Sequence, residues 1–382
     1  MTTNARERVI AAFRHEEPDR TPFFERLIKS PAAEDILGRP SILNNIPYRM
    51  GVLAEASWEE IVEMEARETF DLARTLGFDM IRLGTNMGRD FQRPKKLAPN
   101  TWQIGDRIAE YLETSDVLRW HPLKEESIPE DEQERRRLEE LETPLDKPGW
   151  NDDSFRVWRR VMQLCQEHGI EPAVYCSNYA MPVATLPPYM FRWFRERPEA
   201  LHKFYERCSQ HAIWVGERYA EEGADVIGLG GDLADDQGPM ISPRDYWTFV
   251  GSRIRVQART LKRRGVFVTN TTDGNLWSML DEFLVKTEVN GYGEIDKAAG
   301  MDLRRLKRAH GKRICFLGNL DVRRVLCSGS PEDARREMID CIEAGRGGGG
   351  HVIMTSNCVH RDVKTANYLA AVNAYRDYFG LT

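Results

Sequence analysis

Short apolar runs alternate along most of the chain with longer segments in which apolar residues recur every three or four positions. A short run bounded by turn residues is typical of a buried strand, and the longer pattern is typical of an amphipathic helix. On this basis we predict eight strands, at Phe23–Phe24, Phe78–Gly84, Pro172–Asn178, Ala224–Gly230, Val266–Thr272, Glu288–Ile295, Ile314–Gly318 and His351–Thr355.

Segments with helical periodicity lie between these strands and at both ends of the series. The predicted helices are Asn4–His15, Trp58–Leu76, Asp153–His168, Phe191–Glu222, Tyr246–Arg264, Leu276–Leu284, Leu303–His310, Pro331–Ala344 and Thr365–Phe379. Repeated strand–helix units require parallel strands joined by right-handed crossovers. Eight units predict an α/β fold, a closed (β/α)8 TIM-type barrel with an N-terminal helical extension. Two doubly wound halves would need a linker near the middle of the chain, and the sequence shows none.

Two segments between the second and third predicted strands depart from this pattern. Residues Trp102–Leu112 turn at Gly105-Asp106, which indicates a surface hairpin. Residues Lys124–Pro144 are crowded with Glu and Arg and have few apolar anchors, which indicates a solvated helical excursion. We therefore expect a single barrel domain over residues 1–382, with a charged helical insertion on its surface at about 124–150.

Composition excludes several classes of protein. The net charge is −6, and the 54 basic residues are mixed with 60 acidic ones, so no basic stripe for nucleic acid is present. No window approaches ~18 uncharged apolar residues, and the N-terminus lacks the apolar core of a signal peptide. We expect a cytoplasmic protein without a nucleic-acid or membrane partner. The seven cysteines form no Cys-x-x-Cys pair, so no disulfide framework or zinc ribbon is indicated.

Barrels of this kind carry their active sites on loops at the carboxyl ends of the strands. Asp232 follows the fourth predicted strand directly, ahead of Asp235 and Asp236, and Asp273 follows the fifth. We take Asp232 and Asp273 as candidate catalytic groups, although Asp273 could equally begin the helix from Leu276. The candidate substrate-binding residues either lie at the end of a predicted strand or carry an aromatic side chain close to one. They are Glu25, Arg82, Asn178, Tyr179, Trp277, Glu294 and Asn357.

Cys358 and His360, after the eighth predicted strand, form the most metal-like pair in the chain. A thiolate and an imidazole two residues apart can bind one zinc ion, but a buried cysteine beside a surface histidine fits the same pattern. Common nucleotide, metalloprotease and serine-hydrolase motifs are missing. The glycine-rich run Gly345–Gly350 precedes a strand, where a phosphate cradle should follow one, so it predicts a helix-to-strand turn.

Several short motifs in a fixed order resemble the uroporphyrinogen decarboxylase superfamily, which includes porphyrinogen decarboxylases and corrinoid-linked methyltransferases. The motifs are Arg6-Glu7-Arg8 with Glu17–Pro22, Asp232 through Ser242-Pro243, Thr272–Asn275, Ala299–Leu303, Gly318–Asp321, and Gly348-Gly349 through Asn367. The resemblance covers nearly the whole chain and implies the same (β/α)8 barrel.

The chain departs from both well-known subfamilies. Where the decarboxylases carry an arginine-rich clamp for substrate carboxylates, this sequence reads Phe24–Lys29, and only Arg26 and Lys29 could substitute. Where the zinc-dependent methyltransferases carry His-x-Cys, it reads Thr271-Thr272-Asp273, with Cys358 as the late cysteine. The resemblance and the missing clamp predict a methyltransferase that moves a methyl group from a small O- or N-methyl donor to a corrinoid (cobalamin), with zinc as a further expected ligand.

Two other functions stay open at this stage. One is a decarboxylase of uroporphyrinogen or a smaller carboxylate, with Asp232, Arg82 or Arg26 positioning the acid. The other is a non-catalytic barrel that binds a tetrapyrrole. The partners we expect are a small-molecule substrate, a corrinoid protein and a second copy of the chain in a homodimer.

Overall fold

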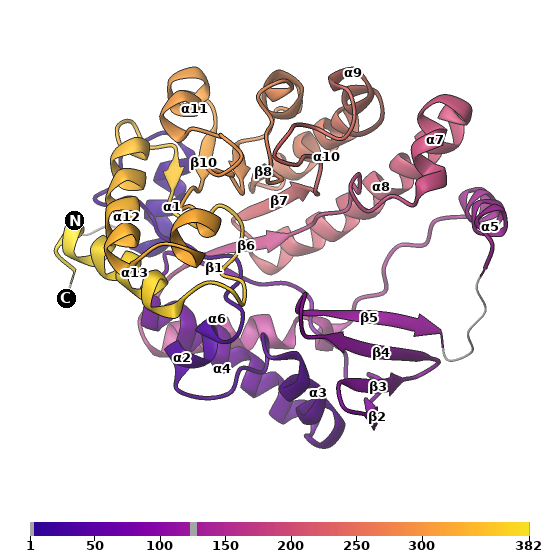
Figure 1. Ribbon diagram of the computed structural model, residues 1–382, viewed down its shortest axis with the longest axis horizontal. Coiled ribbons are helices and arrows are strands. Elements are labelled where there is room, and N and C mark those ends of the chain that lie inside the picture. Colours follow the sequence, from indigo (N-terminus) through magenta and orange to yellow (C-terminus); the bar gives the residue numbers. More distant parts are fainter. Residues whose placement is uncertain (1–3, 123–127, 382) are drawn as a thin grey trace.

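The structure, a computed structural model, describes residues 4–122 and 128–381. Seven parallel strands form one curled sheet in the order β1-β6-β7-β8-β9-β10-β11, and helices cover its outer face (Figure 1). The strands are β1 (Met80–Arg82), β6 (Ala173–Ser177), β7 (Val226–Gly230), β8 (Phe267–Thr271), β9 (Gly291–Gly293), β10 (Cys315–Leu317) and β11 (His351–Val352).

The predicted first strand at Phe23–Phe24 takes the eighth position as a single bridge. The amide of Phe24 donates to the carbonyl of Ile353, 3.0 Å away, beyond β11. On the other side, the amide of Asp79, just before β1, donates to the carbonyl of Phe23 at 2.8 Å. The segment thus bonds to both edges of the curled sheet, and the predicted TIM-type α/β barrel is confirmed.

Most predicted helices are present, and their bounds are α1 (Ala5–Phe13), α4 (Trp58–Leu76), α6 (Arg156–Glu167), α7 (Pro188–Glu196), α8 (Pro198–Glu222), α9 (Pro243–Asp245) with the π-helix η2 (Tyr246–Gly251) and α10 (Ser252–Lys262), α11 (Leu303–His310), α12 (Pro331–Gly345) and α13 (Thr365–Phe379). Capping sets the ends of α4, because the Ser57 side chain accepts from the amide of Glu60 and Gly77 adopts a left-handed φ of 76°. The sequence pattern missed α2 (Ala32–Leu37) and α3 (Ile46–Glu55).

The predicted helix at Leu276–Leu284 is wrong over most of its length. Only a short π-helix, η3 (Asp281–Val285), forms at its end. Side chains take the backbone donors where the helix should begin: the amide of Leu276 contacts Sδ of Met301 at 3.3 Å, and that of Trp277 donates to Oδ1 of Asn275 at 3.2 Å. Periodicity cannot reveal this competition.

Helix α1 closes the amino end of the barrel. Its buried residues Val9, Ala12 and Phe13 pack among side chains from the barrel strands, including Met80 and Val226. Figure 1 shows both chain ends on the side where the strands begin. The strands therefore point away from α1, and their carboxyl ends meet at the open mouth on the other side.

The segment between β1 and β6 is larger than predicted. The hairpin at Gly105 is confirmed as β3 (Thr101–Ile104) and β4 (Arg107–Leu112), and β2 (Lys95–Ala98) with β5 (Val117–Pro122) extends it to a four-stranded antiparallel sheet.

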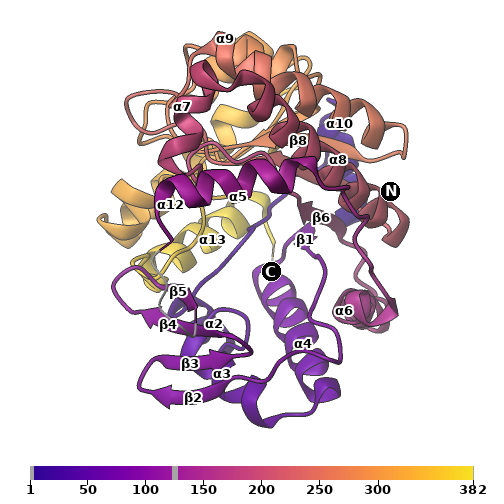
Figure 2. The same ribbon diagram turned by 90° about the vertical axis from the view of Figure 1, so that its right-hand side faces the viewer.

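The charged insertion holds α5 (Glu130–Glu142), which lies against α7 and α8 (Figure 2). Residues 123–127, where this insertion begins, lie outside the described part of the chain.

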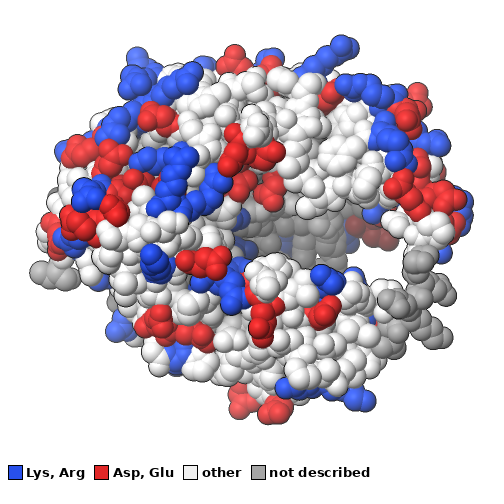
Figure 3. All heavy atoms as spheres, in the orientation of Figure 1, with Lys and Arg blue, Asp and Glu red and all other residues white. Residues whose placement is uncertain are grey.

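The mouth of the barrel faces the antiparallel sheet across a hollow. Figure 3 shows this hollow with acidic and basic side chains around its edge. Within residues 4–122 and 128–381, no helix combines the length and the apolar character needed to cross a bilayer.

Candidate active site

A buried ion pair joins Arg26 to Glu294 at the mouth of the barrel. Glu294 directly follows β9, is 4% exposed, and holds a left-handed φ of 65°, a conformation that costs a non-glycine residue about 1 kcal/mol or more. The Arg26 guanidinium also lies 5.3 Å from the centre of the Tyr179 ring. Strain of this kind gathers at functional sites, which makes Glu294 a candidate functional residue.

Two buried carboxyl groups flank Arg26 and titrate near neutral pH. Burial raises the pKa of Glu294 to about 7, against the opposing charge of Arg26. Burial likewise raises the pKa of Glu25 to about 7, although its carboxylate accepts hydrogen bonds from the amides of Thr355 at 3.1 Å and Arg26 at 3.0 Å. Both groups can therefore hold or release a proton at physiological pH.

Asp273, after β8, is a half-buried acid of the mouth. Its Oδ2 accepts a hydrogen bond of 2.9 Å from Nδ2 of Asn357. Burial raises its pKa, and the charge of Asp232 adds to the rise. Asp232 itself is exposed after β7, and its charge also raises the pKa of Glu294. The structure thus brings Asp232, Asp273 and Glu294 within electrostatic reach of one another.

A missing side chain makes room for a tyrosine pair in the mouth. A Cβ atom on Gly228 in β7 would lie 2.0 Å from the hydroxyl of Tyr175 in β6. Glycine at this position therefore allows the Tyr175 hydroxyl to lie there, where it is 2.8 Å from that of Tyr179.

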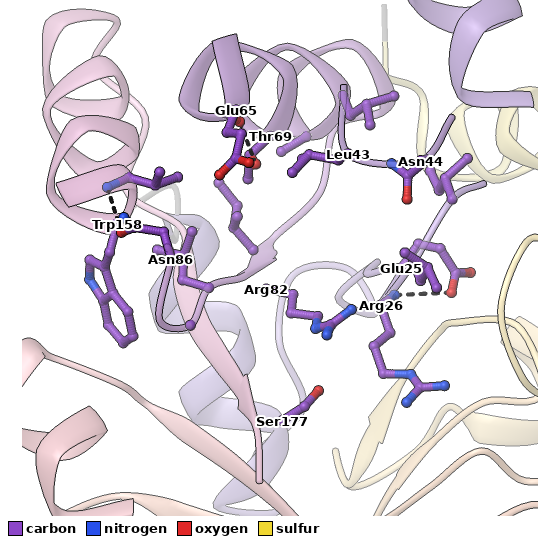
Figure 4. Close-up of a pocket in the computed structure, with 18 of the residues that line it drawn as sticks. Glu25, Arg26, Leu43, Asn44, Glu65, Thr69, Arg82, Asn86, Trp158 and Ser177 are labelled. Atoms are coloured by element: carbon purple, nitrogen blue, oxygen red, sulfur yellow. Dashed lines mark hydrogen bonds between the residues drawn. The ribbon is translucent and has the colours of Figure 1, made fainter. Parts of the chain in front are cut away.

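Two cavities open at the mouth. The first, about 380 Å³, is lined by Glu25, Arg26, Arg82 and Ser177 together with apolar residues (Figure 4). The second, about 650 Å³, is lined by Asp235, Asp236, Asp273, Asp296, Arg323, Asn357, Cys358 and His360, among others. The charges of Glu25 and Arg26 act on the Cys358 thiol, so the two cavities lie close together.

Ion pairs shape the rim of the second cavity. Arg323 donates to both carboxylate oxygens of Asp236 at 2.8 Å and to Asp296 at 3.0 Å. Asp235 accepts from the amides of Gln237 and Gly238, which holds its loop in a turn. Asp235 and Asp236 therefore support the rim, while Asp273 lies deeper.

Two predicted substrate-binding residues face other parts of the structure. The Asn178 side chain donates to the carbonyl of Ala212 in α8 at 2.7 Å, and the Trp277 indole donates to the carbonyl of Gly300 at 3.0 Å. The Arg305 guanidinium lies 3.8 Å from the centre of the Trp277 ring. Neither Asn178 nor Trp277 lines the two cavities described above.

The predicted metal pair, Cys358 and His360, does not form a zinc site with other side chains among the described residues. Nε2 of His360 lies 3.6 Å from Sγ of Cys327 rather than beside Cys358 alone, and burial raises the pKa of the metal-free Cys358 thiol to about 11. The described residues contain no group of three or more His, Cys, Asp or Glu side chains that could hold a metal ion. This donor set does not fit a structural or thiol-activating zinc ion.

Sequence reasoning missed Asp296, Arg323 and Tyr175. Asp296 lies two residues beyond Glu294, so the rule that acids after strands are candidates could have found it. Arg323 had no such signal, because its role depends on a partner in the distant Asp236 loop. Tyr175 lies within a strand, where an aromatic residue is expected to belong to the hydrophobic core.

Comparisons with known proteins agree with the fold. The family model described as "Uroporphyrinogen decarboxylase (URO-D)" matches residues 184–378, just over half of the chain. A search of the curated proteins found no match. A solved methyltransferase from Methanosarcina mazei is similar at 16% identity with a TM-score of 0.62, covering 98% of this chain and 99% of that one.

A D-psicose 3-epimerase from Clostridium cellulolyticum H10 is a more distant match, with 13% identity and a TM-score of 0.39 over 66% of this chain and 95% of that one. The family model begins at residue 184, between β6 and α7, and ends in the last helix, so the matched part includes Asp232, Asp273 and Glu294. The chain belongs to the uroporphyrinogen decarboxylase (URO-D) family.

Proposed function

We propose that this protein is a methyltransferase that moves a methyl group from a small O- or N-methyl donor to a corrinoid carried by a separate protein. The observation that carries the proposal is the acidic mouth of the barrel, where Asp232, Asp273 and Glu294 lie together and Glu294 pairs with Arg26. Membership of the URO-D family supports it, because that superfamily contains corrinoid-linked methyltransferases as well as decarboxylases.

The charge of the mouth argues against a porphyrinogen substrate. A polycarboxylate needs several cations that are free to pair with it. Arg26 is occupied by Glu294, and Lys29 pairs with Asp116 at 2.8 Å. The two residues that could have replaced the decarboxylase clamp are therefore both engaged, whereas a small donor with little charge meets no such obstacle.

In this mechanism, Asp273 donates the proton that the leaving atom needs. When a methyl group leaves oxygen or nitrogen, the electron pair of the broken bond stays on that atom, which then needs a proton. The raised pKa of Asp273 favours its protonated form, and Asn357 orients the carboxyl group. The bound corrinoid would supply the electron pair that bonds to the methyl carbon. Asp232, by its charge, keeps the proton on Asp273 until the leaving atom takes it.

The test is methyl transfer from a panel of methoxylated and methylamine-type donors to cob(I)alamin, followed by the absorbance of the corrinoid. Asp273→Asn should lower the rate about 100-fold, the lower range for a lost general acid. The matched control is Asp90→Asn, an exposed aspartate outside both cavities, which should keep the wild-type rate. A flat trace with every donor would refute the proposal, and so would an Asp273→Asn rate equal to that of the control.

A further inference from the structure

The first cavity has one apolar and one polar wall. It lies between the segment around Glu25, helix α4 and the end of β1 (Figure 4). The apolar side chains that line it are Leu27, Ile28, Leu43, Leu72, Phe78, Ile81, Leu83 and Trp158. A cavity with this wall favours an organic ligand over a hydrated inorganic ion.

Three hydrogen-bond donors of the polar wall have no acceptor. Arg82 makes no hydrogen bond or ion pair within residues 4–122 and 128–381, and Figure 4 shows its side chain extending toward the Glu25–Arg26 segment. The Ser177 hydroxyl and Nε of Arg26 are enclosed and have no hydrogen-bond partner among the same residues. Arg82 is exposed, whereas the other two donors are enclosed, and an enclosed polar group without a partner costs about 1–3 kcal/mol. The Ser177 hydroxyl and Nε of Arg26 therefore call for a ligand that accepts, and the Arg82 guanidinium is available to the same ligand.

When the ion pairs around the cavity are counted among the described residues, one cation, Arg82, has no partner. Arg26 pairs with Glu294, and Glu65 on the opposite wall pairs with Arg49 at 2.7 Å. Glu25 adds a buried carboxyl group to the lining. The basic residues in the described part of the lining are Arg26 and Arg82, so Arg82 is the cation without an ion-pair partner there. A single uncompensated guanidinium matches a ligand with one negative charge, whereas a phosphate dianion would meet a nearby acid and only one partner.

We propose that this cavity binds the methyl donor as an amphipathic monocarboxylate, with its carboxylate on Arg82 and Ser177 and its apolar body against Leu72, Phe78 and Trp158. The inference rests on the proposed function and narrows its donor class. Arg82 is the last residue of β1, and Arg26 both lines this cavity and pairs with Glu294, so a donor held here lies next to the acids of the mouth.

Calorimetric binding to the full chain tests the proposal, with para-methoxybenzoate as the probe and para-methoxybenzamide as its neutral counterpart. The wild type should bind the acid at least about 10-fold more tightly than the amide, the range for one charge-assisted hydrogen bond. Arg82→Gln should remove that preference. Arg263→Gln, an exposed arginine at the amino end of β8, is the matched control and should keep it.

Ser177→Ala provides a second variant and should weaken acid binding by a few fold with little effect on the amide. Equal binding of acid and amide by the wild type, or a preference that survives Arg82→Gln, would overturn the proposal. Inorganic phosphate that competes as well as the organic acid would overturn it too, because the apolar wall would then contribute nothing.

The outcomes separate this proposal from the function on which it rests. If the acid binds through Arg82 but no methyl transfer occurs with any donor, the subsite stands and the methyltransferase assignment fails. If methyl transfer occurs equally well from acid and neutral donors, the enzyme assignment stands and the carboxylate subsite fails.

Discussion

Two aspartates at opposite ends of the barrel, one buried and one half-buried, have contrasting neighbours. At the amino end, Asp79 is fully buried and accepts from Arg20 at 2.7 and 2.8 Å, from Arg8 at 3.1 Å and from the amide of Phe23 at 2.9 Å. At the mouth, Asp273 accepts a side-chain hydrogen bond from Asn357, and its charged neighbours include Asp232 and Asp296. Cations surround the first carboxylate, and other acids lie near the second.

This difference distinguishes an aspartate that stabilises the fold from one that is suited to proton transfer. Arginines and an amide saturate Asp79, so it fastens α1 and the Phe23 bridge to β1 at the amino end of the barrel. Asp273 has a neutral partner and repelling neighbours, so its proton is easier to keep and to pass on. Burial raises the pKa of both groups, but the surrounding charges oppose that rise at Asp79 and add to it at Asp273.

The largest expected effect is on stability. Asp79→Asn leaves two arginines beside a buried amide, and breaking a buried pair in this way costs about 3–5 kcal/mol. Asp273→Asn replaces a protonated carboxyl group with an amide that can still accept from Asn357, so its free energy of unfolding should stay within about 1 kcal/mol of the wild type. Urea denaturation of both variants measures the contrast. Equal losses would show that the two aspartates play the same role.

The next effect is a pH-dependent gain in stability for Glu25→Gln. Burial raises the pKa of Glu25 in the folded state from 4.5 to about 7, so the folded chain binds this proton more tightly than the unfolded chain. Its contribution is therefore most favourable below pH 4.5 and falls as the pH rises toward 7. Glutamine avoids this loss, so the variant should be more stable than the wild type by about 3 kcal/mol at pH 8 and nearly equal at pH 4.5.

Denaturant midpoints across this pH range provide the measurement for Glu25→Gln. Glu55→Gln, an exposed glutamate on α3, is the control and should show no pH-dependent difference from the wild type. A Glu25→Gln variant that loses stability at pH 8 would mean that the hydrogen bonds from Thr355 and Arg26 to the carboxylate outweigh its burial.

The barrel could be predicted because each buried strand carries its own local signal. The apolar runs located seven strands and the bridge at Phe23, and failed at Leu276, where side chains compete for the backbone. The rule for strand ends placed Asp273 and Glu294 at the mouth. It could not show that Asn178 turns to α8, or that Arg26 pairs with Glu294, since both depend on contacts between distant segments.

The smallest expected effect concerns the link between Asp232 and Asp273. The charge of Asp232 raises the pKa of Asp273, so Asp232→Asn should lower that pKa. If Asp273 donates its proton during methyl transfer, activity falls as the pH rises through this pKa. The falling limb of the pH–rate profile should therefore move to lower pH in Asp232→Asn and stay in place in Asp90→Asn. If Asp232→Asn lowers the rate at every pH and the falling limb does not move, Asp232 contributes to substrate binding instead. The raised pKa of Asp273 would then come from burial and not from the charge of Asp232.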